Sequence, residues 1–129
     1  MTNLNSGSAN PNIEASRVEG TVVYNRAGER LGDIHDIVIG KQDGQVKYAI
    51  MSFGGFLGIG EEYHPLPWEQ LDYEEREGGY VVDLNKAALE GAPRYASSSR
   101  PDWNDPTYSR KVDDYYRGFG RATQDPGLM

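Results

Sequence analysis

The two histidines of the chain, His35 and His64, each lie among carboxylates in the sequence. An imidazole nitrogen together with carboxylate oxygens can bind a divalent metal ion. On a strand, Asp33 and His35 would point to the same face of a sheet. However, neither group shows the spacing of a known metal site, so we interpret both histidines as surface residues and expect no metal and no cofactor. The neighbouring carboxylates are Asp33, Asp36, Glu61 and Glu62.

Acid–base catalysis is the second chemistry that these residue types would allow. Asp33 with Asp36, or Glu74 with Glu75, could exchange protons, but such work needs a pocket that shifts a pKa. Nothing in the sequence indicates such a pocket, and the charged run 74–77 is typical of a solvated turn. The chain has no cysteine, which excludes thiol nucleophiles, disulfides and thiolate metal sites. We therefore expect a protein that is not an enzyme, with no catalytic residues.

A glycine-rich segment, residues 54–60, places four glycines among Phe56, Leu57 and Ile59. Glycines can let a backbone approach a phosphate, but this spacing matches no phosphate-binding motif and two glutamates follow it. Two interpretations remain open. The segment is a structural loop whose three apolar side chains turn into the domain, or these side chains are exposed and form an apolar patch for a partner.

The last third of the chain contains a second set of candidate contact residues. Asp105 is a typical N-cap, Pro106 suits the first helical position and Gly118 can end the helix. Apolar and aromatic residues recur between them at spacings of four, three and four, which predicts an amphipathic helix. Tyr and Trp are common anchors of protein interfaces. The candidate contact residues here are Trp103, Tyr108, Val112, Tyr115, Tyr116 and Phe119.

A helix of about 12 residues is marginal in water unless its apolar stripe packs on something. Three possibilities follow from the sequence: the stripe packs on the protein's own sheet, it packs on a partner or a second copy, or the segment is disordered.

The elements that must position these residues are short strands. β-branched and aromatic runs separated by Gly-containing turns predict a mainly β domain, a small antiparallel barrel or sandwich. Two prolines in 63–71 favour an edge strand or an extended segment there. Asn85 caps a short helix that ends at Gly91. The strands are expected at 20–24, 32–39, 45–53, 72–75 and 80–84, and the helix at 86–90.

Composition and charge set limits on the partners. The net charge is −7, which disfavours nucleic acid and anionic lipid as partners. The sequence shows no signal peptide and no apolar run long enough to span a membrane, so we expect a cytoplasmic protein. Residues 1–16 are expected to be disordered, 17–95 to form the barrel, and 96–129 to form a linker and the amphipathic helix. A core of this size is marginal alone, which favours help from the tail or from a second copy.

Residues 18–93 resemble the PRC-barrel family, a module of the photosynthetic reaction centre H subunit and of a bacterial ribosomal RNA processing factor. The opening of the family is similar to 20–23 and 28–34, and its central part to 36–39 and 44–50. Stand-alone bacterial members resemble this chain at 53–61, 65–68 and 91–93. The resemblance implies a six-stranded barrel that makes protein–protein contacts and performs no catalysis.

From these observations the sequence predicts an adaptor barrel that binds an unidentified protein and assists the assembly or regulation of a larger complex. A homodimer is expected, with no direct membrane insertion but with peripheral membrane association through a partner possible. The alternative is a barrel that binds a small ligand or metal ion, with or without hydrolytic chemistry.

Overall fold

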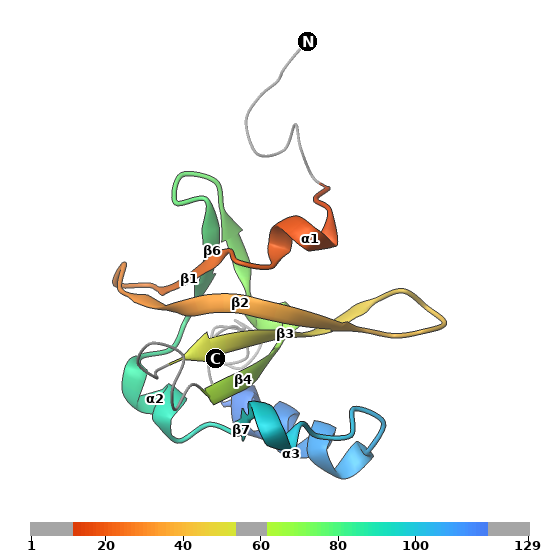
Figure 1. Cartoon of the computed structure of the whole chain (residues 1–129). Coiled ribbons are helices and arrows are strands. Elements are labelled where there is room, and N and C mark those ends of the chain that lie inside the picture. The colour runs from red at the N-terminus through yellow and green to blue at the C-terminus, as the bar shows by residue number, and fades with distance from the viewer. Residues whose placement is uncertain (1–11, 54–61, 119–129) are drawn as a thin grey trace, which may run out of the picture.

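The computed structural model of the chain describes residues 12–53 and 62–118. These residues form a seven-stranded sheet with short helices at both ends of the chain (Figure 1). The strands are β1 (Val22–Asn25), β2 (Arg30–Ile39), β3 (Val46–Phe53), β4 (Glu62–Pro67), β5 (Asp72–Glu74), β6 (Gly79–Val82) and β7 (Tyr95–Ala96). The helices are α1 (Ala15–Val18), α2 (Lys86–Glu90) and α3 (Pro106–Arg117), with 3₁₀ turns η2 (Trp68–Gln70) and η3 (Ser97–Ser99).

The strand order is β5-β6-β1-β2-β3-β4-β7. The β5–β6 hairpin runs steeply across β2 and β3 (Figure 1). The expected mainly β fold is confirmed, but the prediction of six antiparallel strands is not confirmed in detail. A seventh strand, β7, pairs with β4, and β1 pairs with β6 in parallel. β7 has only two residues, too few for a periodic pattern. The parallel pair joins residues 57 positions apart, such as Val23 and Tyr80, which local patterns cannot connect.

The proline-containing strand β4 lies second from one end of the sheet, so it is a paired strand and not the edge strand that the sequence offered as one interpretation. All six of its residues pair with β3 on one side, but only Glu62 and Tyr63 pair with β7 on the other. Pro65 and Pro67 therefore lie beyond the last β7 pairing. Because a proline has no N–H to donate, it is tolerated at a position where no second strand needs that hydrogen bond.

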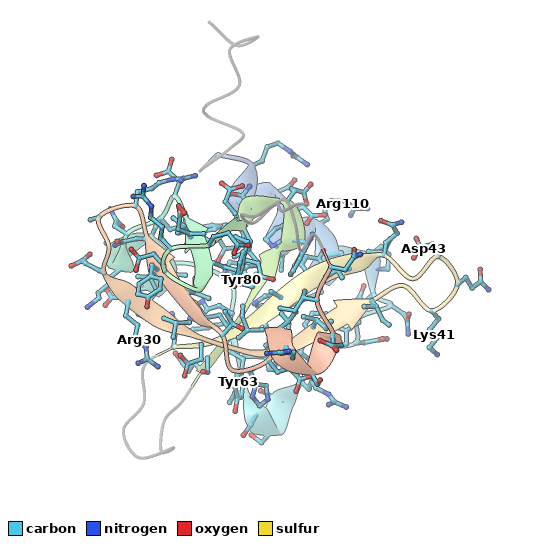
Figure 2. All side chains as sticks on the ribbon, turned by 90° about the horizontal axis from the view of Figure 1, so that it is seen from above. Arg30, Lys41, Asp43, Tyr63, Tyr80 and Arg110 are labelled. Atoms are coloured by element: carbon cyan, nitrogen blue, oxygen red, sulfur yellow. The ribbon has the colours of Figure 1, made fainter. Side chains whose placement is uncertain are left out.

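Strand β3 is covered on both faces. Tyr48 and Ile50 point to one face, and Ala49 and Met51 to the other, yet all four are buried. The hairpin that joins β2 to β3 projects away from the sheet and carries Lys41 and Asp43 near its tip (Figure 2). Gly44 has a positive φ of 71° there, which suits the Asp43-Gly44 pair to a tight hairpin turn.

The N-terminal boundary differs from the expected one. Helix α1 begins at Ala15, two residues inside the segment that was expected to be disordered, and it buries Val18. Residues 1–11 lie outside the described part of the chain. At the other end, the expected boundary between residues 95 and 96 falls inside β7, so the sheet and the C-terminal segment are continuous.

Helix α3 has the predicted capping residues. The side chain of Asp105 accepts a hydrogen bond from the Thr107 N–H at 2.9 Å, Pro106 is the first helical residue, and Gly118 ends the helix. The helix packs against β4 (Figure 1). The short helix α2 also begins as predicted, with the Asn85 side chain accepting from the Ala88 N–H at 2.8 Å.

Candidate interaction surfaces

The amphipathic stripe of α3 lies against the protein's own sheet. Val112 is fully buried and Tyr116 is 1% exposed, and both belong to the same hydrophobic core as the strands. Of the three possibilities left open by the sequence, the structure shows the first. Among the predicted contact residues, these two fill the core and are not available to a partner while α3 is docked. Burial also raises the pKa of the Tyr116 hydroxyl.

Three hydrogen bonds tie α3 to distant parts of the fold. The Tyr48 hydroxyl lies 3.2 Å from Asp113 Oδ1, and Gln70 Nε2 donates to the Tyr116 carbonyl oxygen at 3.3 Å. The Tyr115 hydroxyl donates to a carbonyl oxygen of α2 at 2.6 Å. These contacts reach β3, η2 and α2. The helix is therefore an integral part of the domain.

A continuous row of aromatic rings connects β2 to α3. His35 stacks on Tyr63 with ring centroids 4.4 Å apart, Tyr63 meets Tyr95 at 5.6 Å, and Tyr95 meets Trp103 at 5.9 Å. Trp103 then contacts Tyr108 at 5.9 Å. Trp103, Tyr108 and Tyr115 are partly buried, so the predicted contact residues contribute mainly to packing within the chain. Burial raises the pKa of Tyr95 to about 12, which keeps its hydroxyl protonated.

Three predicted contact residues, Phe56, Leu57 and Ile59, lie outside the described residues, as does Phe119.

The two histidines occupy different environments. His35 is exposed, as predicted, but the prediction that His64 is a surface residue is wrong. His64 is fully buried on β4, where it pairs with Met51 and its ring meets Phe53 edge-on at 5.4 Å. Neither ring nitrogen has a hydrogen-bond partner among the described residues. Burial, helped by the charge of Arg94, lowers the pKa of His64 to about 4, so the ring is neutral at pH 7.

The burial of His64 follows from the position of its strand. β4 is enclosed between β3 and the C-terminal segment, and every residue from Tyr63 to Pro67 is buried. The two prolines obscure the alternation that would have indicated which side chains of this strand point inward. In the described ranges, no three His, Asp or Glu side chains gather where they could hold a metal ion.

A groove with a volume of about 570 Å³ lies where the β1–β2 turn faces the segment between β6 and α2. On one wall, Asn25 fixes the conformation of the β1–β2 turn. Its Oδ1 accepts hydrogen bonds from the backbone N–H groups of Ala27 and Glu29 at 3.0 and 2.9 Å. Its Nδ2 donates to Glu29 Oε1 at 2.7 Å. The lining residues are Asn25, Arg26, Ala27, Glu29, Asp83, Leu84, Asn85, Ala87 and Ala88.

Strand β5 presents a further surface, which no motif of the sequence indicated. It is the end strand of the sheet, and Tyr73 at its centre is 46% exposed. Arg26, on the adjacent turn, forms an ion pair with Asp72 at 2.9 Å. The signal available in the sequence was a tyrosine flanked by acidic residues in a short strand, which does not by itself distinguish an end strand from an internal one.

Comparisons with known proteins give three findings. A family model described as PRC-barrel domain matches residues 11–89. The fold is similar to the crystal structure of a protein described as a 16S ribosomal RNA processing protein, RimM, from Pseudomonas aeruginosa. The identity is 17% and the TM-score 0.38, over 64% of this chain and 50% of that one, so the match spans about half of the RimM chain. No curated protein matches this chain. Within the described residues, no helix is long and apolar enough to cross a membrane.

Proposed function

Because the chain belongs to the PRC-barrel family, we propose that it is an adaptor that binds another protein through its outer surface and performs no catalysis. Its role is to assist the assembly or regulation of a larger complex. The resemblance to the PRC-barrel family implies such a role, and the packing of the fold supports it.

The observation that carries the proposal is the filled interior. The inward-facing side chains of five different strands are at most 1% exposed and belong to one core. In a larger barrel, a ligand can occupy the interior that these side chains fill here. Recognition by this protein then has to use its outer surface. The inward-facing residues are Val23, Ile34, Met51, Leu66 and Val82.

The net charge of the chain limits which class of molecule it can bind. A net charge of −7 repels phosphate backbones, so the partner is a protein and not a nucleic acid. We propose that the protein acts in the cytoplasm, reaching a membrane only through its partner, and that it forms a homodimer. Because α3 contributes Val112 and Tyr116 to the core, the dimer is not required to complete that core.

The test is an affinity capture from native lysate that includes solubilised membranes, with the full-length chain as bait and a protein of the same size and net charge as control. We expect one protein to be enriched by this bait alone, with direct binding reproduced from the purified pair. Recovery of only the bait would contradict the adaptor role. Light scattering on the purified chain would test the dimer separately, since a monomeric mass would contradict it.

The groove beside Asn25 favours a second candidate function, the binding of a small polar ligand. Its walls carry both amide and carboxylate groups and its volume falls in the range of small-molecule sites. A screen of metabolites and divalent cations by thermal shift is the test. A ligand that raises the melting temperature of the wild type, but not of an Asn85→Leu variant, would favour this function over the adaptor.

A further inference from the structure

The outer edge of β5 is available for strand pairing. Among the residues that the structure describes, this strand lies at one end of the sheet and pairs only with β6, through Asp72 with Val81, Tyr73 with Tyr80, and Glu74 with Gly79. An end strand presents N–H and C=O groups on its outer side, and an extended segment of another chain can bind them as an added strand. Tyr73 and Glu74 are both exposed, so β5 lies at the surface of the protein.

Tyr73 provides a fixed aromatic surface beside this edge. Its ring meets the ring of Tyr80 edge-on, with centroids 5.1 Å apart, and Tyr80 in turn meets Trp68 at 5.6 Å. Tyr80 is only 4% exposed. The exposed ring thus rests on a buried aromatic support. A tyrosine that is already held in place loses little conformational entropy when a partner covers it.

The charge around this edge has one dominant sign. Residues 69–77 contain five carboxylates and a single cation, Arg76. Asp72 is paired with Arg26, whereas Glu74, Glu75 and Glu77 form no ion pair within the described residues. The edge therefore combines a strand-pairing surface, an exposed ring and negative charge, which are complementary to a basic segment.

A second copy of this chain is a poor occupant. If two β5 strands paired antiparallel about a two-fold axis, Asp72 of one copy would face Glu74 of the other, and like charges opposite each other destabilise a strand pair. A basic segment would instead be attracted to the carboxylates of β5. Its Lys or Arg side chains can pair with the glutamates, and one can stack on the Tyr73 ring as a cation–π contact.

We propose that the free edge of β5 binds an extended, basic segment of the partner protein as an eighth strand of the sheet. This inference rests on the adaptor function proposed above and names the surface and the chemistry of the partner. The backbone of β5 provides affinity for any extended chain, while Tyr73 and the glutamates select one that is positively charged.

The direct test uses a defined probe, the amidated heptapeptide Lys-Val-Arg-Val-Arg-Val-Lys, titrated into the ¹⁵N-labelled full-length chain. We expect the largest amide shift changes at residues 72–74 and at their β6 partners. A peptide with the cations replaced by glutamate should cause no shift. A basic peptide with alternate backbone N-methyl groups keeps its charge but cannot pair as a strand, so it should bind at least tenfold more weakly.

Two matched variants separate a specific edge from general attraction to an acidic protein. Glu74→Lys with Glu75→Lys should weaken peptide binding about tenfold or more. Glu14→Lys with Glu19→Lys makes the same change of charge near α1 and should alter binding less than twofold. Equal losses in the two variants, shifts centred on other strands, or full binding of the N-methylated peptide would each overturn the proposal.

The same variants distinguish this inference from the adaptor function itself. In the lysate capture, a partner retained by the wild type and the α1 variant but lost by the β5 variant supports both. A partner retained by all three leaves the adaptor function standing and contradicts the β5 site. Capture of no partner by any of the three baits contradicts the adaptor function. In that case the peptide titration alone shows whether the β5 edge binds a basic segment.

Discussion

The hydroxyl of Tyr115 donates a hydrogen bond of 2.6 Å to the backbone carbonyl of Ala88, which connects α3 to α2 across 27 residues of sequence. Near this contact, the fully buried Val112 and Leu89 bring the two helices into one core. The C-terminal helix is therefore held by specific polar contacts as well as by its apolar stripe.

Tyr115→Phe should lower the free energy of unfolding by about 1 kcal/mol, because it removes this hydrogen bond and keeps the ring. Urea unfolding followed by fluorescence measures the change. Tyr73→Phe, at an exposed tyrosine, serves as the control and should change stability by less than about 0.5 kcal/mol. Equal effects of the two substitutions would show that the Tyr115 contact contributes nothing.

Ending the chain at residue 95 should destabilise the barrel itself. The truncation removes the buried side chains of Val112 and Tyr116, which together contribute about 4 kcal/mol of burial, and uncovers Tyr48 and β4. We expect a lower urea midpoint and increased binding of a hydrophobic dye. An α3 variant with Arg110→Ala and Lys111→Ala, at exposed positions, should keep the wild-type midpoint. A truncated chain of unchanged stability would mean that α3 is an independent appendage.

His64 should make stability depend on pH. Its pKa is lowered to about 4 in the folded protein, against 6.5 in the unfolded chain, so the unfolded state binds the proton more readily. The contribution of His64 to the free energy of unfolding is therefore complete above pH 6.5 and is lost as the pH falls toward 4. The total loss of unfolding free energy is up to about 3 kcal/mol.

His64→Leu should remove this slope while remaining at least as stable at pH 7, because it also removes two buried nitrogens that have no hydrogen-bond partner among the described residues. Unfolding measured between pH 7 and 5 gives the comparison. His35→Leu, at the exposed histidine, should keep the wild-type slope. Parallel stability curves for the wild type and His64→Leu would contradict the assignment of this pH dependence to His64.

Gly32 marks a close approach between β2 and β3. An ideal Cβ on this residue would overlap the carbonyl oxygen of Ser52 on the neighbouring strand, so Gly32→Ala forces the two backbones apart. We expect a loss of more than about 2 kcal/mol, measured by thermal or urea unfolding. Gly118→Ala, where no atom of the described residues lies within 4 Å of the added Cβ, should have little effect. A Gly32→Ala protein as stable as the wild type would show that β2 and β3 can move apart at this point without lowering the free energy of unfolding.

The residues that determine local structure could be recognised in the sequence. Asp105 and Asn85 cap helices, and Gly44 allows a tight turn, because each acts through neighbours a few residues away. The amphipathic stripe of α3 was visible for the same reason. These short-range rules located every element longer than two residues except α1, η2 and η3, with ends shifted by one or two residues in most cases.

Tertiary structure decided what these elements contact. Whether Val112 and Tyr116 pack on this chain or on another depends on a surface formed by strands about 50 residues earlier, which no local pattern describes. His64 is buried because β3, β4 and the C-terminal segment come together, and Tyr73 is exposed because β5 is the last strand of the sheet. Burial and edge position are properties of the assembled sheet, set by pairings between distant segments. The sequence alone therefore determined which elements form and where they begin, and the assembled fold determined which of their side chains remain available to a partner.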